Sequence, residues 1–343
     1  MLPVQFEIEI TSKCNARCPG CSRTLDGDTH PDLDMLEITL EEFKHIFPPE
    51  VINERHFGFS GVYGDPGMAR DILPICEYLL ENNADQVYLD TNGGMQTESF
   101  WNTMGKLSES YEQRLCIVFN VDGYTDTNHM YRVNVDWQKL LNNMTAYAST
   151  GGRARWQYIE FDHNAHDIDN ARTLAQKLNF EFRLRRSARN YVPWTTTVKR
   201  KNTTETYQVT TSNLHTEARK KHQVYNNMSN LKTVKFDDIN CRLIHQRQAY
   251  VSHDQRLWPC CWFGDMYHDS IREAEGRAKL LELEALYGTD WNNLKQNSID
   301  KILDHEYYKE VLADSWNTEH NLYISRCVVE CGGHGNRRKT QFF

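Results

Sequence analysis

Short alternating runs of apolar and polar residues recur through the first half of the chain, and stretches with helical periodicity separate them. Alternation with a period of two is typical of strands, whereas apolar residues three or four apart mark one face of a helix. Strands are predicted at residues 4–10, 56–61, 86–89, 115–121, 156–161 and 180–184. Helices are predicted at residues 40–47, 68–80, 137–147 and 169–178, with another after Gly94. Consecutive strand–helix units indicate parallel strands with right-handed crossovers, in either an open doubly wound sheet or a partial barrel.

Clusters of polar residues and glycines follow the first four predicted strands. They run from Cys14 to Cys21, from Gly61 to Pro66, from Thr91 to Gly93 and from Asn120 to Gly123. In both sheet architectures, ligands bind at the edge where parallel strands have their carboxyl ends. One such cluster alone is also what an ordinary turn contains, because Gly, Asn, Asp and Pro dominate turns. Four clusters after four successive strands predict a ligand site at this edge.

Cys14, Cys18 and Cys21 place three thiols within eight residues, which is enough to surround one metal centre. No fourth cysteine lies nearby in the sequence, although His30 could complete a zinc site. Structural zinc takes four protein ligands, whereas a cubane iron–sulfur cluster bound by three thiolates keeps one iron open. The loop therefore fits an iron–sulfur cluster with an open iron, and zinc is the alternative.

The composition is that of an acidic globular protein. Its 343 residues are 39% hydrophobic and 25% charged, with a formal net charge of −8, which disfavours general binding to nucleic acid. No apolar run approaches the ~18 residues of a membrane span, and the first predicted strand leaves no room for a signal peptide. Ten cysteines without a secretory signal favour a reducing compartment, so a cytoplasmic location is expected.

Residues 187–235 interrupt the pattern. This segment is rich in threonine and contains nine lysines and arginines against two glutamates, so a solvated linker or insertion is expected. The alternative is a basic surface for an anionic partner. Beyond it, residues 248–252 and 256–261 predict a hairpin, and helices are predicted at 271–283 and 299–312. This last part holds five cysteines, which are Cys241, Cys260, Cys261, Cys327 and Cys331.

Taken together, the three-cysteine loop, Gly64-Asp65-Pro66, Thr91-Asn92-Gly93 and the C-terminal cysteines resemble the radical S-adenosylmethionine (SAM) superfamily. More narrowly, they resemble members with a C-terminal auxiliary-cluster domain of the SPASM or twitch type. The resemblance implies an α/β fold with a partial (β/α)6 TIM-like barrel over residues 1–186. It also implies a small auxiliary-cluster domain, built from a β-hairpin plus helices, over residues 236–343, with 187–235 as the insertion or linker.

The resemblance also assigns the barrel residues. Cys14, Cys18 and Cys21 would hold a [4Fe–4S] cluster whose open iron binds SAM. Contacts to SAM would come from three later loops, through Gly64, Asp65, Pro66, Thr91, Asn92, Asn120, Asp122 and Arg132. This chain departs from the usual motifs in two places, because Asp65 replaces the common glutamate and Gly20 replaces a common aromatic residue.

In the C-terminal part, the resemblance implies a second [4Fe–4S] cluster held by Cys241, Cys260, Cys327 and Cys331, with zinc as the less favoured metal. Which of Cys260 and its neighbour Cys261 binds the cluster is open. The other is a candidate catalytic group that donates a hydrogen atom to a product radical, and we assign this role to Cys261. The remaining Cys76 and Cys116 lie in apolar patterns and are predicted to be core residues.

The implied reaction is reductive cleavage of SAM to a 5′-deoxyadenosyl radical, followed by abstraction of a hydrogen atom from a substrate. An oxidoreductase or maturase acting on a peptide or protein side chain is favoured, with flavodoxin or ferredoxin as electron donor. The alternative is a radical dehydrogenase or rearrangement enzyme for a sugar or nucleotide. A second alternative is a non-catalytic iron–sulfur or zinc protein that binds nucleic acid through the basic segment, although a nucleic-acid partner is not expected.

Overall fold

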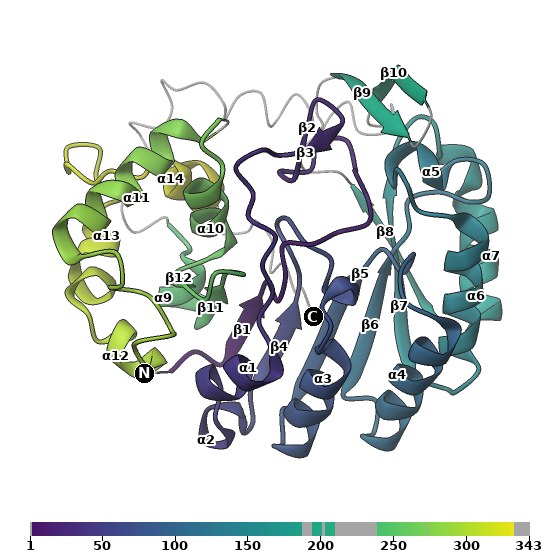
Figure 1. Ribbon diagram of the computed structural model, residues 1–343, viewed down its shortest axis with the longest axis horizontal. Helices are drawn as coiled ribbons and strands as arrows, with labels where there is room; N and C mark the ends of the chain where they lie inside the picture. Colours follow the sequence, from purple (N-terminus) through teal and green to yellow (C-terminus); the bar gives the residue numbers. More distant parts are fainter. Residues whose placement is uncertain (1, 187–193, 201–202, 210–238, 272, 333–343) are drawn as a thin grey trace.

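The computed structural model describes residues 2–186, 194–200, 203–209, 239–271 and 273–332. Its centre is an eight-stranded sheet in the order β12-β11-β1-β4-β5-β6-β7-β8. The strands are β1 (Gln5–Ile8), β4 (His56–Phe59), β5 (Gln86–Thr91), β6 (Leu115–Asn120), β7 (Arg153–Glu160), β8 (Glu181–Arg186), β11 (Gln248–Val251) and β12 (Leu257–Trp258). All neighbouring pairs are parallel except β11 and β12. The expectation of consecutive parallel strands is confirmed, and the curved sheet forms a partial barrel (Figure 1).

Helices connect the strands of the barrel on one face of the sheet (Figure 1). They are α1 (Leu40–Ile46), α2 (Pro49–Ile52), α3 (Ile72–Glu81), α4 (Glu98–Ser110), α5 (Asn128–Tyr131), α6 (Trp137–Ala148) and α7 (Ile168–Lys177), with short 3-10 helices η1 (Pro66–Met68) and η2 (Ala165–Asp167). The start of α1 is a capping box, in which Thr39 Oγ1 accepts from Glu42 N and the Glu42 carboxylate accepts from Thr39 N. This reciprocal pair satisfies two backbone groups at the helix start.

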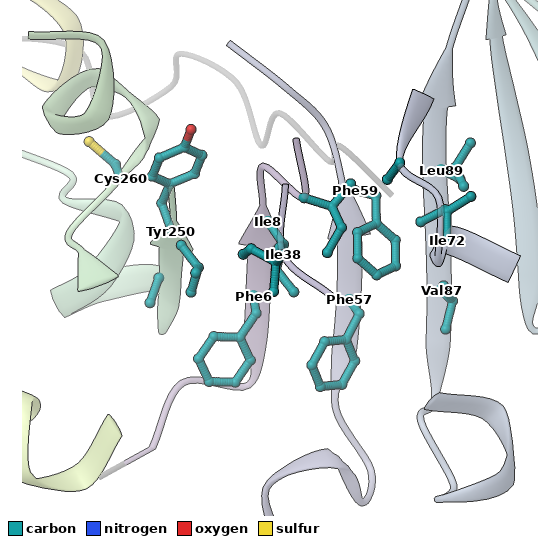
Figure 2. Close-up of a cluster of buried hydrophobic side chains, with 14 of the residues drawn as sticks. Phe6, Ile8, Ile38, Phe57, Phe59, Ile72, Val87, Leu89, Tyr250 and Cys260 are labelled. Atoms are coloured by element: carbon teal, nitrogen blue, oxygen red, sulfur yellow. The ribbon is translucent and has the colours of Figure 1, made fainter. Parts of the chain in front are cut away.

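The two faces of the sheet differ in chemistry because side chains alternate along each strand. The outer face is apolar, and Figure 2 shows Phe6, Phe57 and Leu89 packed in one buried cluster with helix residue Ile72. Burying each such side chain stabilises the fold by roughly 1.5–3 kcal/mol. The same register turns Glu7, Asp90 and Asn120 to the opposite, inner face. Most of the apolar packing of the barrel is therefore on its outer face, while the inner face carries these polar side chains beside a small buried cluster of Tyr88, Cys116 and Val118.

The C-terminal part joins the same sheet instead of standing apart from it. Strand β11 pairs in parallel with β1, so that Phe6 lies opposite Ala249, and β12 folds back beside β11. Around this hairpin lie α9 (Arg242–Gln246), α10 (Cys261–His268), α11 (Ala274–Tyr287), α12 (Ile299–Leu303), the π-helix η6 (Tyr307–Val311), α13 (Leu312–Asp314) and α14 (Ser325–Cys331). The sequence placed residue 261 in the hairpin, but the strand ends at Trp258 and Cys261 begins a helix.

Two small hairpins lie near the carboxyl end of the barrel (Figure 1). One is β2 (Thr24–Leu25) with β3 (Asp28–Thr29), and the other is β9 (Trp194–Arg200) with β10 (Thr203–Val209). Lys199 Nζ and Asp28 Oδ2 lie 3.3 Å apart and join them. The second hairpin lies within the basic segment 187–235, and the rest of that segment is outside the described residues. In the part of the chain that the structure describes, no helix is long and apolar enough to cross a membrane.

Candidate functional site

The loop of Cys14, Cys18 and Cys21 begins at the carboxyl end of β1, where a parallel sheet presents its ligands. Cys18 is buried and the other two thiols are half-buried. Burial and the neighbouring thiols raise the pKa of Cys14, and burial raises the pKa of Cys18 to about 11. The thiols of Cys14 and Cys18 are therefore neutral without metal, and metal binding must release their protons.

Gly64 brings the second loop against this first one. A Cβ atom added at Gly64 would lie 1.6 Å from the Thr11 carbonyl oxygen, so only glycine allows the two backbones to approach this closely. The Asp65 backbone N–H donates to the Lys13 carbonyl at 2.9 Å. The loop after β4 is thus fixed directly beside the cysteine loop.

Asp65 joins the second loop to the third. One carboxylate oxygen accepts from Gly67 N (2.9 Å) and from Thr91 Oγ1 (2.8 Å), and the other accepts from Asn92 N (2.7 Å). Burial raises the pKa of Asp65, and these hydrogen bonds oppose that shift. Because a carboxylate has about four acceptor positions, Asp65 keeps capacity for a further donor.

Asn92 and Arg132 connect the third and fourth loops to the cysteines. Asn92 Nδ2 donates to Asn15 Oδ1 at 2.8 Å and lies 3.9 Å from Cys14 Sγ. Arg132 Nη1 lies 3.7 Å from Cys18 Sγ, and its Nε pairs with Asp122 Oδ2 at 2.7 Å. A buried guanidinium stabilises negative charge on a nearby thiolate. Of the residues assigned to SAM, Asp65, Asn92, Asp122 and Arg132 therefore lie around the thiols of Cys14 and Cys18.

Asn120 lies elsewhere, in a row of polar side chains on the inner face. Its amide donates to Asp90 Oδ1 at 3.2 Å and accepts from Gln157 Nε2 at 2.9 Å, and Arg185 Nε donates to Gln157 Oε1 at 3.0 Å. Burial, together with the charges of Glu7 and Asp65, raises the pKa of Asp90 to about 6, against the hydrogen bond from Asn120. Asp90 and Gln157 were not singled out from the sequence. Both are polar residues that alternate with apolar residues along β5 and β7, and this pattern could have placed them on the inner face.

Glu7 continues the inner face toward the C-terminal cysteines. Its carboxylate accepts from Ser60 Oγ (2.9 Å), Gln248 Nε2 (3.1 Å) and Arg242 Nη1 (3.1 Å). The same Arg242 nitrogen lies 3.7 Å from Cys261 Sγ. A polar path therefore leads from the inside of the barrel to the second group of cysteines.

That second group comes from three separate elements. Cys241 precedes α9, Cys260 precedes α10, and Cys327 and Cys331 lie one turn apart on α14. The Asn240 N–H donates to the Cys331 carbonyl at 3.0 Å, which ties the two ends together. Burial raises the pKa of Cys260, and so do the charges of Cys261, Cys327 and Cys331 nearby. The four predicted ligands are thus close neighbours in the fold.

The donors in both cysteine groups are thiols, which suit iron–sulfur clusters and, where four are present, also zinc. Among the described residues, no three His, Cys, Asp or Glu side chains are placed to share one metal ion. A cubane cluster binds each thiolate through a different iron, so its thiols need not converge on one point. Near the second group, the buried Tyr307 hydroxyl has no hydrogen-bond partner in the described part of the chain, as expected of a donor to a bound group.

The structure also places four other residues that the sequence analysis singled out. His30, the candidate fourth zinc ligand, is turned toward Asp269, with its Nε2 3.3 Å from the carboxylate. Cys76 and Cys116 are fully buried, as predicted for core residues. Pro66 begins the short helix η1, which its fixed φ favours.

Comparisons with known proteins find the fold but no close relative. No family model and no curated protein matches the sequence. Streptococcus suis SuiB bound to its precursor peptide SuiA is similar over 81% of this chain and 67% of that one, at 12% identity and a TM-score of 0.52. The enzyme anSMEcpe with bound AdoMet and Kp18Cys peptide is similar over 90% and 82%, at 14% identity and a TM-score of 0.52. Both are radical SAM enzymes, and this chain has their fold.

Proposed function

We propose that this protein is a radical SAM enzyme that modifies a peptide or protein side chain. The supporting observation is that the loops after β4, β5 and β6 all meet the three-cysteine loop, through Gly64, Asn92 and Arg132. Neither a zinc knuckle nor a ferredoxin loop requires such convergence. When bound, the cluster and SAM supply one-electron cleavage of SAM to methionine and a 5′-deoxyadenosyl radical, which takes a hydrogen atom from the substrate.

The residues of the chain hold and orient these groups. Cys14, Cys18 and Cys21 would hold the cluster, and Arg132 lowers the free energy of a thiolate at Cys18. Asp122 fixes the guanidinium of Arg132 and offsets its charge. Asp65 offers its remaining acceptor capacity to the ammonium group of SAM, and Thr91 and Asn92 hold that carboxylate in place.

The inner face is where we place the substrate. Its polar row, from Arg242 and Glu7 to Asn120 and Arg185, offers donors and acceptors to a polar side chain or peptide backbone. The peptides in the SuiB and anSMEcpe structures support a peptide substrate for this chain. The position of the substrate matters because abstraction of a hydrogen atom by a radical requires the reacting atoms to be held close together with water excluded.

The second group of cysteines is proposed to hold an auxiliary [4Fe–4S] cluster through Cys241, Cys260, Cys327 and Cys331. Cys261 is left as the candidate hydrogen-atom donor, and its contact with Arg242 supports that role because Arg242 also binds Glu7 on the inner face. When bound, such a cluster would supply one-electron redox chemistry beside the inner face. Flavodoxin or ferredoxin would supply the electron that reduces the first cluster.

The central experiment uses anaerobically reconstituted protein with dithionite and SAM, and measures 5′-deoxyadenosine. The wild type is expected to form it, and the triple change of Cys14, Cys18 and Cys21 to Ala is expected to abolish it. Cys76→Ala is the matched control, because Cys76 is a buried core thiol. Formation of 5′-deoxyadenosine by the triple variant would disprove the assignment.

Iron counting tests the second site. About eight irons per chain are expected for two cubanes, and about four irons with one zinc would show a zinc site instead. Cys260→Ala is expected to lose about four irons. Cys261→Ala is expected to keep all of them and to lose substrate turnover while still cleaving SAM.

A further inference from the structure

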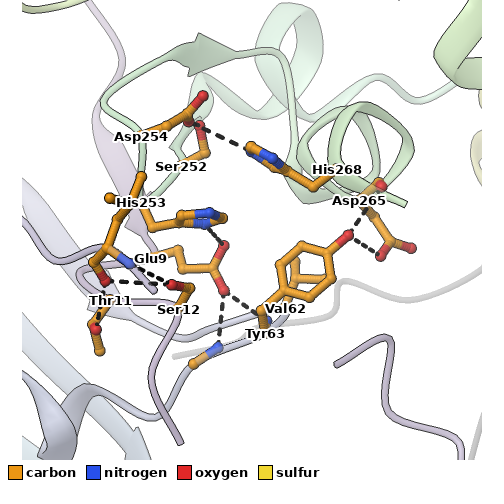
Figure 3. Close-up of polar contacts among 12 residues, drawn as sticks. Glu9, Thr11, Ser12, Val62, Tyr63, Ser252, His253, Asp254, Asp265 and His268 are labelled. Atoms are coloured by element: carbon orange, nitrogen blue, oxygen red, sulfur yellow. Dashed lines mark hydrogen bonds and ion pairs between the residues drawn. The ribbon is translucent and has the colours of Figure 1, made fainter. Parts of the chain in front are cut away.

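Glu9 lies between the barrel and the C-terminal hairpin and is 1% exposed. Its carboxylate has hydrogen-bond partners on both sides (Figure 3). One oxygen accepts from the backbone N–H groups of Tyr63 (2.6 Å) and Gly64 (3.1 Å). The other accepts from Tyr250 Oη (2.7 Å) and lies 3.0 Å from His253 Nδ1.

The first pair of bonds controls the loop that carries Asp65. Residues 60–65 have no helix or strand of their own, so groups outside a regular helix or sheet must satisfy their backbone N–H groups, as Lys13 does for Asp65 and Glu9 does for Tyr63 and Gly64. Removing the Glu9 carboxylate would leave the buried N–H of Tyr63 and the half-buried N–H of Gly64 without their acceptor, and the loss is costliest for the buried group. Asp65 follows Gly64 directly, so the position of its carboxylate depends on how Glu9 holds this loop.

The second pair of bonds comes from the C-terminal hairpin. Tyr250 lies in β11, and His253 lies at the hairpin tip and is 1% exposed. Burial lowers the pKa of His253, but the bond to Glu9 and its charge outweigh burial and raise it, which favours the imidazolium form. An imidazolium on a buried carboxylate is a charge-assisted hydrogen bond, which is stronger than a neutral one.

A further contact holds the same loop from the C-terminal side. The Tyr63 hydroxyl lies 3.1 Å from the Asp265 carbonyl oxygen and 3.2 Å from its carboxylate on α10. The loop after β4 therefore lies between the cysteine loop on one side and the C-terminal part on the other.

We propose that Glu9 is a positioning residue through which the hairpin residue His253 holds the Gly64–Asp65 loop ready to bind SAM. The inference rests on the proposed function, because it assigns SAM to Asp65. It adds that the C-terminal part contributes to SAM affinity through Glu9. If the hairpin were displaced, the chain would keep all its cysteines but would bind SAM with lower affinity.

The test compares Glu9→Ala, Glu9→Gln and His253→Ala in reconstituted protein. Glu9→Ala and His253→Ala are expected to raise the Kd for SAM at least about 10-fold, the effect of losing one hydrogen bond to a charged group. KM for SAM in the cleavage assay is expected to rise with it, while kcat and iron content change little. Glu9→Gln keeps an acceptor for the two N–H groups and is expected to recover part of the affinity.

The matched control is Gln255→Ala at the same hairpin tip. Gln255 Nε2 donates to Glu42 Oε1 at 2.8 Å, so this change removes another hydrogen bond between hairpin and barrel but leaves Glu9 alone. Its thermal stability is expected to fall while its Kd for SAM stays within about 2-fold of the wild type.

Hydrogen exchange gives a readout that does not depend on SAM. The Tyr63 and Gly64 amides are expected to exchange at least about 10-fold faster in Glu9→Ala and His253→Ala than in the control. Unchanged exchange, or a SAM affinity that falls equally in Gln255→Ala, would overturn the inference. If the wild type with a full cluster failed to bind SAM, the proposed function itself would be wrong.

Discussion

Tyr307 and Tyr308 are adjacent buried tyrosines of the π-helix η6 with opposite hydrogen-bonding states. The Tyr308 hydroxyl donates to the Leu257 carbonyl at 2.5 Å, whereas that of Tyr307 has no partner among the described residues. Burial raises the pKa of Tyr307, and so do the nearby Tyr308 and the thiols of Cys327, Cys241 and Cys260. The Tyr307 hydroxyl is therefore close to the proposed cluster ligands and free to donate to a bound cluster.

The two changes to Phe should have opposite effects on the metal-free protein. Tyr308→Phe removes a satisfied bond and is expected to lower the free energy of unfolding by about 0.5–1.5 kcal/mol. The Leu257 carbonyl also accepts from Asn292 Nδ2 at 3.1 Å, so it is not left without a donor. Tyr307→Phe removes a hydroxyl buried without a partner, which costs roughly 1–3 kcal/mol in the folded state. Its unfolding free energy is therefore expected to stay equal or to rise. Urea unfolding after iron removal measures both.

In protein that carries its clusters, the Tyr307→Phe and Tyr308→Phe variants test the proposed hydrogen bond from the Tyr307 hydroxyl to the second cluster. Donors to cluster sulfur favour the more negatively charged reduced form, so they raise the reduction potential. Tyr307→Phe should make the potential of the second cluster more negative and leave the first cluster unchanged, as followed by electron paramagnetic resonance in a redox titration. Tyr308→Phe should shift neither. A second-cluster potential that is the same in the wild type and in Tyr307→Phe would refute the reasoning.

Further predictions concern the buried acids. Asp65→Asn replaces an acceptor of the Thr91 and Asn92 loop, so SAM affinity measured by equilibrium binding should fall about 10-fold or more, and an unchanged Kd would contradict the assignment. Asp122→Asn leaves the buried charge of Arg132 without its carboxylate and should lower the unfolding free energy in urea by about 3–5 kcal/mol; a loss below about 1 kcal/mol would count against this. The raised pKa of His253 means that its bond to Glu9 stabilises the fold fully below pH 6.5, and this contribution is lost as pH rises through the folded-state pKa. The unfolding free energy should therefore fall as the pH rises from about 6.5 through the raised folded-state pKa, and His253→Gln should flatten that slope, whereas equal slopes would exclude the bond as its source.

The barrel could be predicted from the sequence because its signals are local. The predicted strands at 86–89 and 115–121 correspond to β5 and β6, and the helix at 137–147 corresponds to α6. The apolar periodicity of a strand or a helix is visible within a short run of consecutive residues, so its recognition does not depend on distant parts of the chain. The position of polar residues after each strand followed from the same order, since parallel strands share one carboxyl edge.

The parts that could not be predicted depend on pairing over long distances. The stretch at 248–251 reads as a strand, but nothing in it shows that its partner is β1, more than two hundred residues earlier. The strands β9 and β10 are rich in threonine, and buried apolar residues such as Val198 and Val209 are too sparse along them to show a period of two in the sequence. Pro259 has no N–H to donate to a strand ladder, and it stands between the end of β12 and the start of the helix at Cys261.

Because β11 pairs with β1, the two cysteine groups are attached to neighbouring strands of the same sheet. Cys14 follows β1, and Cys260 follows the hairpin whose first strand is hydrogen-bonded to β1. A shift of that hairpin would therefore move Cys260 relative to Cys14, and it would also move His253 away from Glu9. Arg242 lies between the groups, with one nitrogen near both Glu7 and Cys261. A substrate on the inner face would thus lie between two cysteine groups whose spacing is fixed by one continuous sheet, and not by a flexible linker between domains.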